Sequence, residues 1–154
     1  PEDLKDKESM AETIENNIRK TIVDENPTNP KYFEKMSVLL DELIEQRKQE
    51  VIDYKKYLEE MARLAEKVKR SQDSNYPKEI NTPGKQAIFD NLSQDVDWVE
   101  RLDHAIQTNK QDGYLTNKMK QKRLKAQLKP LADEKGLNID EVFELIIRQA
   151  EYGA

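Results

Sequence analysis

The stretch that follows Pro30 constrains the fold of this chain more than any other, because no glycine or proline occurs in it before Pro77. Its apolar side chains recur at helical spacing and fall on one broad stripe, as an amphipathic helix requires. Asn29 is placed to cap such a helix, and Pro30 suits its first position, where a missing N–H costs nothing. We therefore predict one uninterrupted helix over about residues 30–70, which at 1.5 Å per residue is about 60 Å long.

Arg47 interrupts the apolar stripe of this helix, inside the charged run from Glu45 to Glu50. In one interpretation it is a solvated node, with the arginine stem lying along the apolar face. In the other it is a structural ion-pair node, in which carboxylates of a neighbouring helix hold the guanidinium and fix the register of the two helices. Val38 and Ile52 face the opposite side of the helix, which is weak evidence for a second contact surface.

A first helix precedes the long one. Apolar positions four residues apart predict it from Met10 to about Asp24, with residues 1–9 frayed. The connection to the long helix is short and contains two prolines, which favours antiparallel neighbours. We therefore expect a long helical hairpin over residues 10–70.

Shorter helices follow the hairpin. A polar loop over residues 71–83 leads to a smaller helical subdomain over residues 84–154. Thr82, followed by a proline, and Asn138, followed three residues later by a glutamate, are placed to cap two of its helices.

Composition agrees with a helical fold. Hydrophobic residues make up 36% of the 154 residues and charged residues 37%, so the predicted core is thin and the solvated surface large. Only four glycines are present, which argues against a β-rich chain with many tight turns. We therefore expect a single all-α domain, a bundle of about six helices built on the helix at 30–70. The chain starts at Pro1 rather than at a methionine, and we expect it to be a piece of a longer protein.

Groups for catalysis are scarce. Cysteine is absent, which excludes disulfides and thiolate sites and fits a reducing cytosol, and the single histidine, His104, lies in no recognised motif. No phosphate-binding loop, hydrolase, zinc-protease or calcium-loop motif occurs. No apolar run of about 18 residues and no signal peptide is visible. We therefore expect no catalytic, cofactor-binding or metal-binding residue in this chain, no membrane partner, and a cytoplasmic location.

One segment has a strong charge bias: no acidic residue occurs between Asp112 and Asp133, although the net charge of the chain is −5. The candidate nucleic-acid-binding or partner-binding residues of this segment are Lys118, Lys120, Lys122, Arg123, Lys125 and Lys129. The four lysines other than Lys120 are spaced 4, 3 and 4 residues apart and share one stripe of a predicted helix. A solvated basic face is one interpretation, and contact with a duplex phosphate backbone or an acidic protein surface is the other. No aromatic residue is interleaved, which argues against stacking on single strands.

Short blocks of sequence, in a fixed order, carry a resemblance to a known family. Residues 29–47 read NPKYFEKMSVLLDELIEQR, and RKTIVDE precedes them at 19–25. Further blocks are YP at 76–77, INTP at 80–83, FDNL at 89–92, QDG at 111–113 and NK at 117–118. Together they resemble the C-terminal region of the motor (R) subunit of type I restriction enzymes. The resemblance covers nearly the whole chain and is weakest over residues 129–140.

The resemblance implies a bacterial multisubunit enzyme that cleaves foreign DNA after ATP-driven translocation. In that family the nuclease and helicase-like domains lie N-terminal to this region, so ATP and Mg²⁺ would bind outside this chain, and no catalytic residue is carried over. The resemblance therefore implies that this chain is a non-catalytic helical domain. Such a domain would attach the motor subunit to a methyltransferase core of modification and specificity subunits. Contact with duplex DNA through the basic helix at 118–129 is the alternative.

Overall fold

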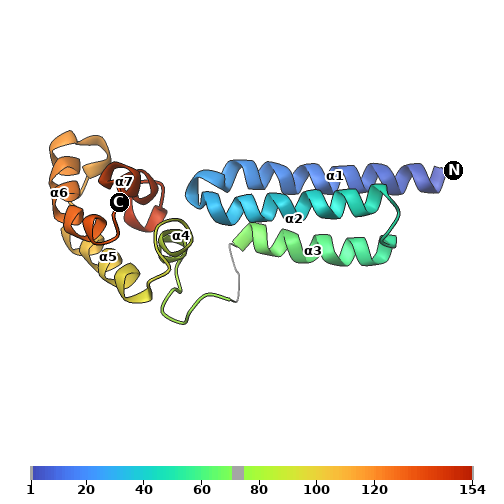
Figure 1. Ribbon diagram of the computed structural model, residues 1–154. Coiled ribbons are helices and arrows are strands. Elements are labelled where there is room, and N and C mark those ends of the chain that lie inside the picture. Colours follow the sequence, from blue (N-terminus) through green and yellow to red (C-terminus); the bar gives the residue numbers. More distant parts are fainter. Residues whose placement is uncertain (1, 71–74, 154) are drawn as a thin grey trace. The chain divides into compact units, whose positions relative to one another are not determined.

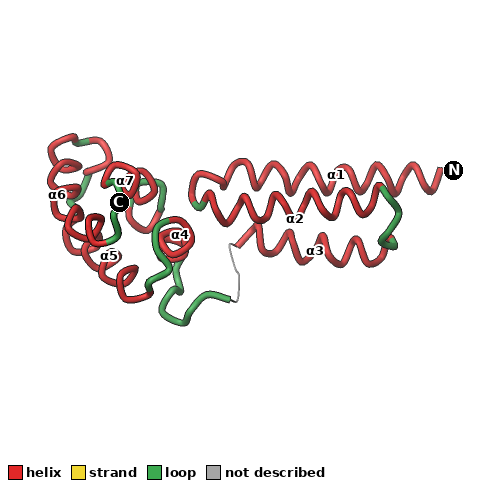
Figure 2. The backbone as a smooth tube through the Cα atoms, in the orientation of Figure 1, coloured by secondary structure: helices red, strands yellow, loops and turns green. Residues whose placement is uncertain are grey.

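The protein is an all-α fold, as predicted. A computed structural model describes residues 2–70 and 75–153, and this part of the chain contains helices and no strand (Figures 1 and 2). Its α-helices are α1 (Glu2–Glu25), α2 (Pro30–Lys48), α3 (Tyr54–Arg70), α4 (Pro83–Asn91), α5 (Val96–Asn109), α6 (Lys118–Glu134) and α7 (Ile139–Ile146). Three 3-10 helices are added: η1 (Asn26–Thr28), η2 (Tyr114–Thr116) and η3 (Ala150–Tyr152).

The helices divide between two compact units. The first unit contains α1, α2 and α3, and the second contains α4 to α7 together with Pro27–Asn29. Residues 71–74, in the loop predicted over 71–83, lie outside the described residues, and residues 75–82 of that loop contain no α-helix. Each unit has its own apolar core.

The uninterrupted helix predicted over residues 30–70 is wrong, because α2 ends at Lys48. Its end is a Schellman motif: the backbone N–H of Val51 donates to the carbonyl of Gln46 over 3.1 Å, and the N–H of Glu50 donates to the carbonyl of Arg47 over 3.1 Å. Glu50 adopts a left-handed conformation with φ of 57°, which glycine usually supplies at this position. A glutamate there gives no sign in the sequence that a helix ends.

Asp53 starts the next helix. Its Oδ1 accepts a hydrogen bond from the backbone N–H of Lys56 over 2.8 Å, and its carbonyl accepts one from the N–H of Tyr57 over 2.9 Å. The chain has turned back by then, so α3 lies beside α2 instead of extending it (Figure 1). The predicted two-helix hairpin over residues 10–70 is therefore a three-helix unit.

The first unit buries one face of each helix, and α1, α2 and α3 each pack against the other two (Figure 1). The buried seam of α1 differs from the prediction, because Ala11 is buried and Met10 is 57% exposed. Residues 2–9, which we expected to be frayed, are helical. The buried apolar core of the unit is Ala11, Ile18, Ile22, Tyr32, Phe33, Met36, Leu40, Tyr57, Met61, Leu64 and Val68.

The second unit packs α5 against α6, α6 against α7, and α4 against both α5 and α7. Thr82 caps α4 and Asn138 caps α7, as predicted, each through a side-chain oxygen that accepts from backbone N–H groups of the first turn. Trp98 is fully buried in this core, and its Nε1 donates to the carbonyl of Leu131 over 2.9 Å. The other members with no exposed surface are Ile88, Val99, Leu102, Ile106, Leu128, Val142, Ile146 and Tyr152.

Candidate interaction surfaces

The basic segment forms α6, whose inner face belongs to the second core. Leu124, Leu128 and Ala132 are buried. Asn117 begins the helix, since its Oδ1 accepts from the backbone N–H of Lys120 over 3.0 Å. The charged side chains of α6 are thereby fixed on its outer side, where most of them are exposed.

Two of the four lysines in the predicted stripe have acidic partners. Lys125 Nζ lies 3.1 Å from Asp140 Oδ1 and 4.9 Å from the ring centroid of Phe143, both on α7. Lys129 Nζ lies 3.0 Å from Asp133 Oδ2, one turn further along α6. The positive charge of the predicted stripe is therefore partly neutralised over its C-terminal half.

The N-terminal half of α6 keeps its charge. Lys118, Lys122 and Arg123 are exposed, and within the described residues they form no ion pair. Lys120 Nζ donates to the backbone carbonyl of Asp112 over 2.5 Å, which leaves its charge uncompensated. No acidic residue lies in the first turn, and cations there oppose the helix dipole by about 0.3–1 kcal/mol. The basic side chains at the start of α6 therefore do not stabilise this helix.

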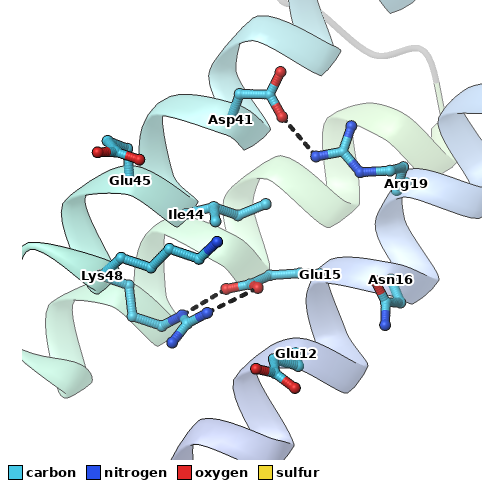
Figure 3. A pocket seen from close by; sticks show the side chains of 9 residues that line it. Glu12, Glu15, Asn16, Arg19, Asp41, Ile44, Glu45 and Lys48 are labelled. Carbon is cyan, nitrogen blue, oxygen red and sulfur yellow. Dashed lines mark hydrogen bonds and ion pairs between the residues drawn. The ribbon is translucent and has the colours of Figure 1, made fainter.

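Arg47 lies at a node that joins all three helices of the first unit. Its Nε is 2.7 Å from Glu15 Oε2 and its Nη2 is 3.1 Å from Glu15 Oε1, so the pair is bidentate (Figure 3). Tyr57 of α3 donates its hydroxyl to Glu15 Oε2 over 2.7 Å. The side chains of Arg47 and Glu15 are only 13% and 7% exposed. In the structure, therefore, Arg47 forms an ion pair with a neighbouring helix, which is the second of the two interpretations, and is not a solvated node.

Burial and the ion pair shift the protonation equilibria at this node. The hydrogen bond to Glu15 raises the pKa of Arg47 above its ordinary value. Burial, and then the hydrogen bond to Glu15, raises the pKa of the Tyr57 hydroxyl. Both groups therefore keep their protons over the whole physiological range.

Our sequence reasoning missed Glu15, although the sequence contains a signal for it. With Ala11, Ile18 and Ile22, Glu15 forms a seam spaced 4, 3 and 4 residues apart. A carboxylate inside one apolar stripe and an arginine inside another are complementary charges that both need a partner. The second contact between these helices, Arg19 to Asp41, is more exposed and closes the upper side of the polar pocket in Figure 3.

A second groove runs between α2 and α3, and we call it the α2–α3 groove. Its apolar lining is Leu39 and Leu43 from α2, Leu64 from α3, and Ile52 from the turn that joins them. Leu39 is 38% exposed and Leu43 and Ile52 are half-buried. The volume of the groove, about 390 Å³, is enough for a few side chains. It contains no histidine, and its only acidic groups, Glu42 and Glu60, lie on opposite helices.

Metal ligands do not gather in the described part of the chain. No group of three or more His, Cys, Asp or Glu side chains there could hold a metal ion. His104 is exposed, and its Nε2 lies 3.5 Å from the hydroxyl of Thr108. No helix in the described ranges has the length and apolarity that a membrane crossing requires.

Comparison with family models, with curated proteins and with solved structures finds no match to this chain.

Proposed function

We propose that this chain is a non-catalytic assembly module that docks the motor subunit of a bacterial type I restriction enzyme onto its methyltransferase core. The parent subunit would be a cytoplasmic, ATP-dependent, DNA-translocating endonuclease. The proposal rests on the sequence resemblance and on one structural observation. The most specific block of that resemblance, residues 29–47, falls on α2, which has apolar side chains on two faces. One face is the core of the unit, and the other exposes Val38 by 57% and Leu39 by 38%.

Exposed apolar side chains outside the core are what a docking face needs, because burying them against a partner removes apolar surface from water. Val38 and Leu39 present this apolar surface to water in the isolated chain. A helical module with well-filled cores and an outward apolar pair suits assembly better than chemistry.

Binding of purified modification and specificity subunits to the isolated chain tests this proposal. We expect binding at micromolar concentration, and a loss of about tenfold or more for the double variant Val38→Glu, Leu39→Glu. Val23→Glu is the matched control, because Val23 is 65% exposed on α1 and does not line the α2–α3 groove. Absence of binding by the unaltered chain, with circular dichroism confirming that it is folded, would reject the proposal.

A second candidate function is contact with duplex DNA through the N-terminal half of α6. It is favoured by the uncompensated charges of Lys118, Lys120, Lys122 and Arg123. Four phosphate contacts would release condensed counterions and give a log–log salt slope of about −3.6. Lys125 and Lys129 would raise the number of phosphate contacts to six, but both are paired with acidic residues.

Fluorescence anisotropy with a labelled duplex, measured between low and physiological salt, tests the second candidate. Lys122→Glu should weaken binding about tenfold at low salt and reduce the slope by about 1. Lys20→Glu changes the charge of the chain equally but lies on α1, so it should have little effect. A flat salt dependence, or equal losses for both variants, rules out contact through α6.

A further inference from the structure

Charged side chains line the edge of the α2–α3 groove that α3 forms. Lys56, Glu60, Arg63 and Lys67 are spaced 4, 3 and 4 residues apart, so they follow one edge of α3 beside the groove. Glu60 Oε1 lies 3.2 Å from Lys56 Nζ and also pairs with Arg63. One carboxylate therefore serves two cations, and Lys67 forms no ion pair within the described residues. The α3 edge has three positive charges against one negative charge.

The walls of the groove are two helices, whose backbone N–H and C=O groups are already paired within each helix. An extended peptide would find no strand edge to extend, whereas a helix can insert side chains spaced one turn apart. The apolar residues Leu39 and Leu43 are themselves one turn apart. From Lys56 to Lys67 the edge is about 16 Å long, which matches about three turns of a docked helix.

No described helix of a second copy offers such an apolar stripe. The exposed large apolar side chains of α1 are Leu4, Met10 and Val23, which lie about 100–140° apart around the helix axis. The other described helices expose at most two, so none has a free apolar stripe. The described helices of a second copy are therefore poor occupants of the groove.

We infer that the α2–α3 groove receives an amphipathic helix of a partner subunit, with apolar anchors one turn apart on the groove lining and carboxylates along the α3 edge. The partner's identity as a methyltransferase subunit rests on the proposed function, whereas the chemistry of the occupant rests on the groove alone. Charge complementarity along α3 then sets the direction in which the helix is bound.

The absence of cysteine makes a site-specific test possible, because a single introduced thiol is unique. Leu39→Cys places an environment-sensitive fluorophore on the groove, and Val23→Cys places the same label on α1, at an exposed residue that does not line the groove. Each labelled chain is titrated with the methyltransferase core and with two synthetic helical peptides. Both peptides have leucines one turn apart, and they differ in having glutamates or lysines on one flank.

We expect the glutamate peptide to change the emission at position 39 and not at position 23, and to bind about tenfold more tightly than the lysine peptide at low salt. Lys67→Glu should weaken the glutamate peptide about threefold or more, whereas Lys69→Glu, on α3 but not lining the groove, should not. These charge variants keep the test valid if the labelled chain is poorly folded. Equal responses at positions 23 and 39, equal affinity of the two peptides, or no binding of either overturns the inference.

The same titration separates this inference from the proposed function. If the methyltransferase core binds without any change at position 39, the groove inference is wrong and the proposed function stands. If the glutamate peptide binds at position 39 and the core does not bind, the groove inference stands and the proposed function is rejected. Self-association of the chain that changes the emission at position 39 would show that a second copy is the occupant, and would overturn the inference.

Discussion

Replacing Arg47 with methionine tests whether the buried node organises the first unit. Methionine keeps most of the apolar stem that packs along α2 and removes the guanidinium, so Glu15 is left with its charge and only the Tyr57 hydroxyl as a partner. Removing one member of a buried ion pair typically costs 3–5 kcal/mol, because the remaining charge is uncompensated. Arg47 is 13% exposed and borders a polar pocket, so water reaches part of the site. We therefore expect a loss near the lower end, about 3 kcal/mol.

Arg63→Met is the matched control. Arg63 is in the same unit and also pairs with a glutamate, but its side chain is 64% exposed. Exposed pairs of this kind contribute about 0–1 kcal/mol, since water screens the charges and the side chains lose entropy when they pair. Comparing Arg47→Met with Arg63→Met therefore separates the effect of losing a buried ion pair from the effect of removing a positive charge.

Urea unfolding followed by circular dichroism at 222 nm measures the two losses. With a denaturant slope of about 1–3 kcal/mol per molar urea, Arg47→Met should lower the midpoint of the first unit by about 1–3 M. Fluorescence of Trp98, the only tryptophan, reports on the second unit separately. If Arg47→Met loses no more stability than Arg63→Met, the buried pair does not hold the three helices together. The double variant Glu15→Met, Arg47→Met should recover most of the loss, because no charge is then left buried.

Two further predictions concern the second unit. Burial, and then the hydrogen bond to Asp103, raises the pKa of Tyr152 above its ordinary value of 10.0, so above pH 10 this hydroxyl ionises in the unfolded chain first. The free energy of unfolding should then fall as pH rises, by about 1 kcal/mol from this group between pH 10 and 11, and Tyr152→Phe should remove that part of the fall in urea titrations over this range. Gly84→Ala should destabilise by about 1 kcal/mol, because a Cβ there would lie 2.5 Å from Glu151 Cδ and displace the carboxylate that accepts from the Gly84 N–H. In a Glu151→Ala background the same change should be neutral or stabilising, since alanine favours a helix, and a loss of equal size in both backgrounds would contradict this reading.

The parts of the fold that depend on local chemistry could be predicted from the sequence. Thr82 before a proline and Asn138 before a glutamate are capping signals, and each begins a helix in the structure. The all-α class follows from apolar spacing and the scarcity of glycine. These signals act over three or four residues and do not require the tertiary structure.

The pairings between helices could not be predicted in the same way. The sequence predicts that Lys125 belongs to a free basic stripe because no acidic residue lies near it along the chain, but Asp140 approaches it from α7. The sequence allows two interpretations of Arg47 because its partner is 32 residues away, on α1. Which charges are compensated depends on packing, so a charge-biased segment overstates the free charge of the surface that it forms.

Glu50 explains the largest difference between sequence and structure, and it leads to a last prediction. A left-handed conformation costs a residue with a Cβ about 1–2 kcal/mol, whereas glycine adopts it without that penalty but loses about 0.5–1 kcal/mol of backbone entropy on folding. Glu50→Gly should therefore stabilise the first unit, by about 0.5–1 kcal/mol in urea unfolding. Lys48→Gly, in the last turn of α2, should destabilise it by a similar amount, because a glycine there has the entropic loss and no conformational gain. If both glycines destabilise equally, the turn at Glu50 is not what ends α2, and the helix break must be explained by the cap at Asp53 alone.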